Sequence, residues 1–121
     1  MIFSKVRING TEVVVPPVPV TSAEIEQRLQ PMYERLKLPE GRLELMTGIE
    51  SRHYWDRDIR PSEASAEAGT KLLESSCVKR EDIDLLIHCG VCRDRLEPAT
   101  AAYVHGLLKL PKQCQILDIS N

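Results

Sequence analysis

The fold is decided by residues 83–119, which contain the stretches I-D-L-L-I-H-C-G-V at 83–91, P-A-T-A-A-Y-V-H-G-L-L at 98–108 and Q-I-L-D-I at 115–119. The outer two are short apolar runs of strand length, and the continuous apolar start of the first indicates burial on both faces. The middle stretch begins with a proline, which suits the first turn of a helix, and has Ala101, Val104 and Leu108 on one side. A strand, a helix and a strand with short links predict an α/β fold with a mixed, partly parallel sheet and packed helices.

Two further helices are predicted upstream. One runs from Pro61 to about Ser76, and its face of small residues predicts close packing against a sheet or another helix. The other follows a capping box in which Thr21 is the N-cap and Glu24 reaches back to it. Its apolar stripe is interpreted as core packing, and a proline within the stripe predicts a kink or a restarted helix. The stripe consists of Ile25, Leu29, Met32 and Leu36, and the proline is Pro31.

The first twenty residues predict a hairpin. Residues 2–8 have apolar side chains at the even positions 2, 6 and 8, Asn9-Gly10 is a common hairpin turn, and residues 11–15 are predicted to form the returning strand. The prolines within 16–19 are expected to end the pairing, because proline has no N–H to donate. A short helix is predicted at 42–46.

The composition excludes several classes of protein. Lysines and arginines number 16 against 18 acidic residues, giving a net charge of −2, so the positive footprint of a nucleic-acid-binding protein is absent from the sequence. Of the 121 residues, 42% are apolar and 28% charged, which is typical of a folded chain. The sequence has neither a secretory signal pattern nor an apolar run of membrane-spanning length. We therefore expect a soluble, cytoplasmic protein whose four cysteines are thiols.

The pair Cys89 and Cys92 is the most obvious candidate for redox or metal chemistry. It lies at the end of a predicted strand, where three extended residues separate the two Cα atoms by about 10 Å, beyond the roughly 7 Å that a disulfide tolerates. A zinc site would need further ligands, and the three histidines, His53, His88 and His105, show no paired spacing. We predict no metal site and interpret His88 as a packed, hydrogen-bonded side chain.

Glu97 precedes Pro98 and is therefore disfavoured in helical geometry, so it is expected at the N-cap of the 98–108 helix. Glutamate is not a preferred N-cap residue. It either interacts with the positive end of the helix dipole, an effect of about 0.3–1 kcal/mol, or extends away from the helix toward another group. The residues alone leave both interpretations open.

Several motifs, in their order along the chain, resemble the amino-terminal part of the 3-oxoacyl-ACP synthase III enzymes, which are condensing enzymes of the thiolase superfamily. These motifs are Thr47-Gly48-Ile49 with Arg52, the small-residue helix at 64–73, and the stretches 83–87 and 97–101. Residues 29–31, 54–56, 93–94 and 96–98 are most similar to the branch that begins olefin biosynthesis by joining two fatty acyl-CoA molecules head to head. The resemblance covers the whole chain and implies a thiolase-like fold and a homodimer.

The resemblance also implies which catalytic residues the chain contains. In this family the strand that resembles 116–119 leads into the nucleophilic cysteine, which is therefore expected just beyond Asn121. Residues 1–121 are accordingly expected to be an amino-terminal part, truncated before that cysteine and inactive alone. The family's catalytic histidine and asparagine come from the carboxy-terminal half. Glu97 matches the glutamate that acts across the dimer, in the olefin branch, as the base for the second substrate. Arg42 and Met46 stand where typical ACP-dependent enzymes have a tryptophan and an arginine that clamp the CoA adenine, so that clamp is absent.

The leading prediction is an acyltransferase of lipid biosynthesis that condenses acyl-CoA thioesters, in a Claisen reaction, to a 3-oxoacyl product. CoA or ACP thioesters are the expected substrates, and no cofactor is expected. The expected partners are a second copy and the remaining carboxy-terminal part, with no nucleic acid and no membrane span. One alternative is a standard 3-oxoacyl-ACP synthase III of fatty acid biosynthesis that uses malonyl-ACP. The others are a non-catalytic α/β binding module and a thiol oxidoreductase that uses Cys89 and Cys92.

Overall fold

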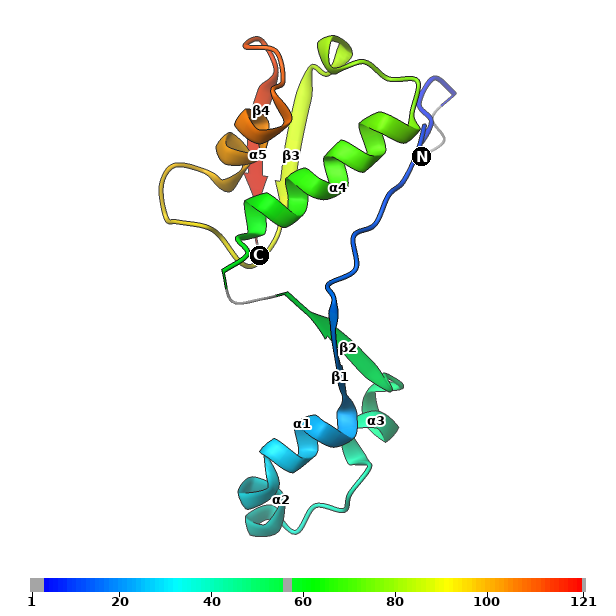
Figure 1. Cartoon of the computed structure of the whole chain (residues 1–121), viewed down its shortest axis with the longest axis vertical. Coiled ribbons are helices and arrows are strands. Elements are labelled where there is room, and N and C mark those ends of the chain that lie inside the picture. Colours follow the sequence, from blue (N-terminus) through cyan, green and yellow to red (C-terminus); the bar gives the residue numbers. More distant parts are fainter. Residues whose placement is uncertain (1–3, 56–57, 121) are drawn as a thin grey trace. The chain divides into compact units, whose positions relative to one another are not determined.

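The structure is a computed structural model that describes residues 4–55 and 58–120. It divides into two compact units, whose helices and strands are labelled in Figure 1. The α/β unit contains the chain up to Val14 and from Ile59 onward, and the helical unit contains Val15–Asp58.

Three of the predictions concern positions outside the described residues. These positions are residues 2–3 of the predicted first strand, Asp56 of the motif at 54–56, and Asn121, just beyond which the nucleophilic cysteine is expected. The expected position of that cysteine therefore stays a prediction.

The α/β unit has the predicted strand–helix–strand order. β3 (Leu85–Cys89) and β4 (Gln115–Ile119) pair in parallel, in a register that runs from Leu85 opposite Gln115 to Cys89 opposite Ile119. α5 (Thr100–Leu108) lies between them in the chain and forms the crossover that a parallel pair requires. α4 (Pro61–Ser75) and a 3-10 turn, η1 (Arg80–Asp82), come before β3. The predicted α/β architecture with a parallel strand pair is confirmed.

The core of the α/β unit lies where its two helices meet one face of the sheet. The buried members are Ala66, Val104, Leu108, Leu110 and Cys114, and Leu73, Ile83 and Leu86 pack against them. A Cβ atom added to Gly69 of α4 would lie 3.0 Å from Cδ1 of Leu108 on α5. Such a separation is closer than ordinary packing allows, so the small-residue face of α4 is what permits the two helices to approach each other.

The opposite face of the sheet is uncovered within the described residues. Leu85 and Ile87 of β3 and Leu117 and Ile119 of β4 share that face, and each is between 45% and 51% exposed. The prediction that the first strand is buried on both faces is therefore wrong for the described residues, because α4 and α5 pack on the same face (Figure 1). In the part of the chain that the structure describes, no helix is long and apolar enough to cross a membrane.

The helical unit contains three short helices between two paired strands. β1 (Val18–Thr21) pairs antiparallel with β2 (Ser51–Tyr54), and α1 (Ser22–Arg28), α2 (Gln30–Leu36) and α3 (Arg42–Thr47) lie between them in the chain. The capping box is present, since Thr21 Oγ1 accepts from the Glu24 N–H at 3.1 Å and the Thr21 N–H donates to the Glu24 carboxylate at 2.7 Å. The helix is interrupted at Leu29, and Pro31 lies in the first turn of α2, so the predicted restart is confirmed.

The predicted amino-terminal hairpin is wrong. Residues 6–16 have no regular secondary structure. A Cβ atom on Gly10 would lie 3.1 Å from Cδ1 of Leu72, so this segment passes along α4 instead of turning back on itself. Pro19 lies inside β1, so the prolines do not end the pairing either. A strand with one partner points alternate N–H groups away from that partner, and a proline at such a position loses no ladder bond.

The apolar stripe of α1 and α2 does not form a core within the described residues. Leu29 and Leu36 are exposed, and the buried residues of α1 are the polar Ser22 and Glu26. Both are hydrogen-bonded to other elements, because Ser22 donates to the carbonyl of Ile49 and Glu26 accepts from three groups described below. Polar contacts of α1 therefore connect the elements of the helical unit.

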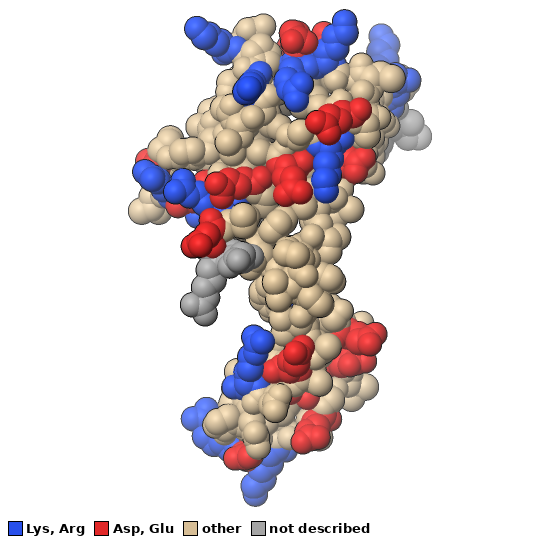
Figure 2. All heavy atoms as spheres, in the orientation of Figure 1, with Lys and Arg blue, Asp and Glu red and all other residues tan. Residues whose placement is uncertain are grey.

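Figure 2 shows side chains of both charge signs on the visible face of each unit.

Candidate functional site

Glu97, the predicted catalytic residue, lies in the irregular segment 90–99 between β3 and α5, which we call the Glu97 loop. Its side chain is exposed, and the Glu97–Pro98 peptide bond is cis. The prediction that Glu97 is the N-cap and Pro98 the first helical residue is wrong, because the N-cap is Ala99 and α5 begins at Thr100. Of the two interpretations that the sequence left open, the structure therefore favours a glutamate that extends away from the helix.

α5 begins at Thr100 because its first backbone N–H groups find an acceptor on a neighbouring strand. The Asp118 carboxylate of β4 accepts from the Thr100 N–H through Oδ2 and from the Ala101 N–H through Oδ1, both at 2.8 Å. Thr100 and Ala101 are fully buried, so water does not replace this acceptor. A carboxylate at this place also faces the positive end of the helix dipole. Asp118 therefore fixes the residue at which α5 begins.

Asp94 attaches the Glu97 loop to both helices of the α/β unit. Its carboxylate accepts from the Ser62 N–H at 3.0 Å and from the Ser62 hydroxyl at 2.5 Å, in the first turn of α4. Its own N–H donates to Thr100 Oγ1, the first residue of α5, at 3.4 Å. Arg93, the residue before it, hydrogen-bonds to Ser120 after β4. Glu97 thus lies midway between two attached residues, Asp94 and Thr100.

The thiols and the histidine that the sequence singled out in this unit are not assembled into a reactive centre. Cys89 and Cys92 are exposed free cysteines. His88 is packed, with its side chain 10% exposed and its Nδ1 atom 3.7 Å from Asp118 Oδ1. Among residues 4–55 and 58–120, no three histidine, cysteine or acidic side chains are grouped in a way that could hold a metal ion.

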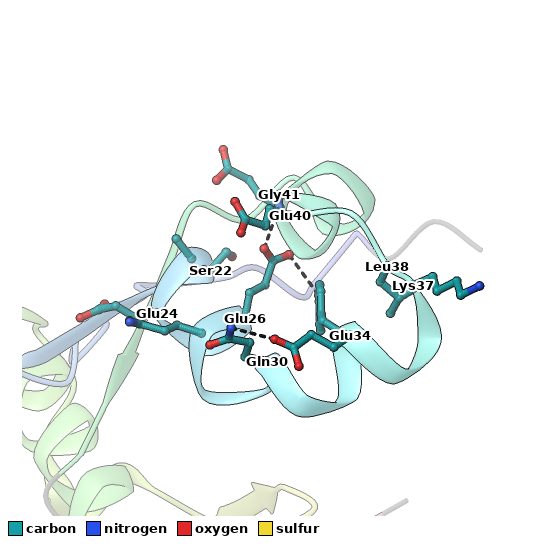
Figure 3. Close-up of a pocket in the computed structure, with 13 residues that line it drawn as sticks. Ser22, Glu24, Glu26, Gln30, Glu34, Lys37, Leu38, Glu40 and Gly41 are labelled. Carbon is teal, nitrogen blue, oxygen red and sulfur yellow. Dashed lines mark hydrogen bonds between the residues drawn. The ribbon is translucent and has the colours of Figure 1, made fainter.

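The helical unit contains a pocket of about 720 Å³ that is lined by α1, α2 and the start of α3 (Figure 3). Glutamates dominate its lining, and they are Glu24, Glu26, Glu34, Glu40 and Glu44. Figure 3 shows Glu26 pointing toward the chain at Gly41, whereas the other labelled glutamates lie around it. The pocket is thus acidic, and Glu26 is its buried member, 7% exposed.

The Glu26 carboxylate joins α1 to the start of α3. It accepts hydrogen bonds from the Tyr33 hydroxyl at 3.0 Å, from the Gly41 N–H at 2.7 Å and from the Leu43 N–H at 2.6 Å. α3 has Gly41 as its N-cap and so has no side-chain cap of its own, and Glu26 replaces that cap. The Leu43 N–H is the main reason that the pKa of Glu26 is lowered from its ordinary value of 4.5, although burial opposes the shift. This residue is therefore structural, and its carboxylate is engaged by three donors of the helical unit.

A Glu26→Gln variant is expected to unfold at a lower temperature than the parent protein at pH 7, because an amide accepts the two backbone N–H groups less well. The lowered pKa of Glu26 means that its contribution is fully present above about pH 4.5 and is lost as the pH falls through the lower folded-state pKa. The difference in thermal midpoint between parent and variant should therefore shrink from pH 7 to pH 3. Glu34→Gln, at an exposed pocket position, is the control and should change the midpoint little; an equal loss in both variants would contradict the assignment.

The motif Thr47-Gly48-Ile49 with Arg52 is brought together by one polar network. Arg52 donates to the Ser22 hydroxyl at 2.8 Å and to Thr47 Oγ1 at 3.4 Å, and Ser22 donates to the Ile49 carbonyl at 2.5 Å. Gly48 ends α3 with a φ of +66°. Residues other than glycine rarely adopt this left-handed backbone conformation. These motif residues hold the end of α3 against β2 and α1, so their role in this unit is structural.

No protein-family model matches the chain, but curated proteins do. The acyl-CoA:acyl-CoA alkyltransferase of Xanthomonas campestris pv. campestris is 40% identical over 121 residues, which are all of this chain and 36% of that protein. The protein of the same name from Shewanella oneidensis is 36% identical over 121 residues, again all of this chain and 35% of that protein. The chain thus spans about a third of the length of these curated relatives.

A solved structure of Xanthomonas campestris OleA, in which glutamine replaces one glutamate, superposes with a TM-score of 0.86 at 38% identity. The superposition covers 94% of this chain and 33% of that chain. The fold is thiolase-like. The predicted fold class is therefore confirmed, and so is the resemblance to the amino-terminal part of the olefin branch. OleA has also been solved with serine in place of one cysteine and with lauric acid and lauroyl-CoA bound.

The role of the residues that attach the Glu97 loop was not predicted from the sequence, although Asp94 belongs to the motif at 93–94 and an indirect signal was present. Neither Arg60 before α4 nor Ala99 before α5 has a side chain that hydrogen-bonds to its helix as an N-cap. A helix without a local N-cap needs an acceptor from elsewhere in the fold. Asp94 is the acceptor at the start of α4, and Asp118 is the acceptor at the start of α5.

Proposed function

We propose that residues 1–121 form the amino-terminal part of a thiolase-superfamily acyltransferase that joins two acyl-CoA molecules in a Claisen condensation. The observation that supports this most directly is the 40% identity over the whole chain to a protein named acyl-CoA:acyl-CoA alkyltransferase. The thiolase-like fold supports it as well, and the OleA structure with bound lauroyl-CoA supports a fatty acyl-CoA as the substrate.

The reaction needs two half-reactions. In the first, the thiolate of the cysteine proposed just beyond Asn121 attacks the carbonyl of one acyl-CoA, and free CoA leaves while the acyl group becomes a thioester on the enzyme. In the second, a base removes a proton from the α-carbon of the other acyl-CoA, and the resulting carbanion attacks the enzyme thioester. The enzyme thiolate leaves, and the product is a 3-oxoacyl-CoA. Because no CO₂ is lost, the carbanion can form only by proton removal, so a general base is required.

Glu97 is the proposed base, acting on a substrate held by the partner subunit. Its carboxylate is exposed within the described residues and is not used to cap α5, so it is free to meet a group outside this unit. An acyl channel would surround it with apolar groups, and such burial raises the pKa of a carboxylate toward the range useful for a base. A solved OleA structure in which one glutamate is replaced by glutamine is consistent with a functional glutamate in these relatives.

The relatives and the residues of this chain favour this function over its alternatives. A standard 3-oxoacyl-ACP synthase III would be expected to have the tryptophan and arginine of the adenine clamp, where this chain has Arg42 and an exposed Met46. A binding module or a thiol oxidoreductase is less well supported, because the Xanthomonas and Shewanella relatives are both named as transferases. The exposed Cys89 and Cys92 are not needed for the proposed chemistry.

A substrate panel tests the proposed function. The full-length protein, given fatty acyl-CoA alone, is expected to release CoA and form a 3-oxoacyl product without releasing CO₂. Given acyl-CoA with malonyl-ACP, it is expected to release little ¹⁴CO₂ from carboxyl-labelled malonyl groups. Mass spectrometry of the thioester products and scintillation counting measure the two outcomes. Efficient ¹⁴CO₂ release with malonyl-ACP, and none of the head-to-head product, would instead establish the decarboxylative synthase.

The proposal includes a homodimer in the cytoplasm, without a metal or redox cofactor. A second subunit would supply the substrate channel into which Glu97 extends. The condensation transfers an acyl group and a proton, so neither half-reaction changes an oxidation state. CoA thioesters are made and used inside cells, which supports the cytoplasmic assignment.

A further inference from the structure

The Glu97 loop is irregular, but the segment 94–100 around Glu97 has two fixed ends. Asp94 lies three residues before Glu97 and Thr100 three residues after it, and the Asp94 N–H donates to Thr100 Oγ1 at 3.4 Å. This bond closes residues 94–100 into a small loop. Its contacts lie against buried residues, since Ser62 is 2% and Thr100 0% exposed, and Asp94 itself is half-buried. Glu97, at the middle of the loop, is exposed.

Each end is attached to a different rigid element. The Asp94 carboxylate accepts two hydrogen bonds from Ser62 in the first turn of α4. Thr100 is the first residue of α5, and its N–H is held by Asp118 of β4 at 2.8 Å. α4, α5 and the sheet share one core. Movement of either end would therefore require a shift of a packed helix or the loss of a partly buried hydrogen bond.

We infer that Asp94 and Thr100 are positioning residues for Glu97, an inference that rests on the proposed function of Glu97 as the base. A base must lie within hydrogen-bond reach of the proton that it removes, and misplacement by 1 Å can cost about 100-fold in rate. A loop of irregular backbone does not by itself hold a side chain to that tolerance. The bonds from Asp94 to Ser62 and Thr100 supply the restraint, and they leave the Glu97 carboxylate free.

The inference predicts an effect on one half-reaction only. Glu97 acts in the condensation step and has no part in the first acyl transfer, so loosening the loop should slow condensation alone. A residue that only stabilised the fold would slow both half-reactions together when lost. Single-turnover rates of acylation and of condensation in the full-length enzyme, with a fatty acyl-CoA as substrate, separate these two cases.

The test uses matched substitutions at the two ends of the loop. Thr100→Val keeps the shape of the side chain but removes the oxygen that accepts from Asp94, and Thr100→Ser restores that oxygen. Asp94→Ala removes both bonds to Ser62. We expect Thr100→Val and Asp94→Ala to slow condensation by about 10- to 100-fold, with acylation within about 2-fold of the parent. Thr100→Ser should condense at a nearly normal rate, and so should Leu110→Ala, which weakens the core without contacting the loop by a hydrogen bond.

Two outcomes would overturn the inference. One is normal condensation in both Thr100→Val and Asp94→Ala while Glu97→Gln, measured in parallel, is slow; the base assignment would then stand without positioning by these residues. The other is an equal loss of acylation and condensation that Thr100→Ser does not rescue, which would make the residues merely structural. Normal condensation in Glu97→Gln would overturn the proposed base and this inference together.

Discussion

Replacing Glu97 with glutamine in the full-length enzyme is expected to slow condensation by about 10²- to 10⁴-fold, the usual contribution of a general base. Glutamine has nearly the shape of glutamate, but its amide cannot take up the α-proton of the second acyl-CoA. The first half-reaction does not involve this carboxylate and should keep its rate. The enzyme thioester is then expected to accumulate in Glu97→Gln, and rapid quenching followed by mass spectrometry of the intact protein detects it.

Two variants control this experiment. Glu97→Asp keeps the carboxylate on a shorter side chain, so its condensation rate should fall between those of the parent and Glu97→Gln. Glu67→Gln changes an exposed glutamate of α4, which pairs with Lys71 at 3.6 Å, and should leave both half-reactions unchanged. If Glu97→Gln condenses acyl-CoA at the parent rate, the base is another residue.

The parts of the fold that the sequence predicted correctly are those specified by near neighbours. The Thr21–Glu24 capping box joins residues three positions apart, so its pattern is visible in the sequence. The interruption of the helix near Pro31 follows from a missing N–H in that residue itself. The strand–helix–strand order of 85–119 follows from apolar runs and a short amphipathic helix, which are also local signals.

The errors arise where partners lie far apart in the chain. The first helical residue of α5 is fixed by Asp118, 18 residues from Thr100, and not by the residues next to Pro98. The start of α3 at Arg42 was predicted correctly, but its partner Glu26, 15 residues before Gly41, was not. An apolar or charged residue in a sequence shows that burial or pairing is favoured, but it does not identify the partner. The incorrect prediction that β3 is buried on both faces arose in this way, because its apolar residues do not show which element covers each face.

The candidate site shows the same contrast between a local signal, which the sequence contains, and a distant partner, which it does not identify. Glu97 itself was identified from the sequence by its resemblance to a family motif, and its exposed place in a loop agrees with a group that extends from the unit. Asp94 was also part of a family motif, but its role in attaching the loop was not predicted, since it contacts Ser62 across 32 positions of the chain. A recognised motif therefore identified the candidate reactive group, and the structure was needed to find what holds it.

An Asp118→Ala variant is expected to lose about 2–6 kcal/mol of stability, because two buried N–H groups at the start of α5 lose their acceptor and each such group costs about 1–3 kcal/mol. Thr100 and Ala101 are both 0% exposed and the Asp118 side chain is 14% exposed, so this carboxylate shields their N–H groups from water. His88, 3.7 Å from the same carboxylate, would lose its neighbour as well. Since whole domains are stable by only about 5–15 kcal/mol, this is a large fraction of the total.

Thermal unfolding of the full-length protein measures the loss, and hydrogen exchange of the α5 amides localises it. Exchange at Thr100 and Ala101 should accelerate most, because their N–H groups donate directly to Asp118. Asp118→Asn keeps one carbonyl acceptor and should lose less stability than Asp118→Ala. Glu67→Ala removes only an exposed ion pair and should change stability by less than about 0.5 kcal/mol. Unaltered exchange at the start of α5 in Asp118→Ala would show that another group, and not this carboxylate, fixes the beginning of the helix that follows the Glu97 loop.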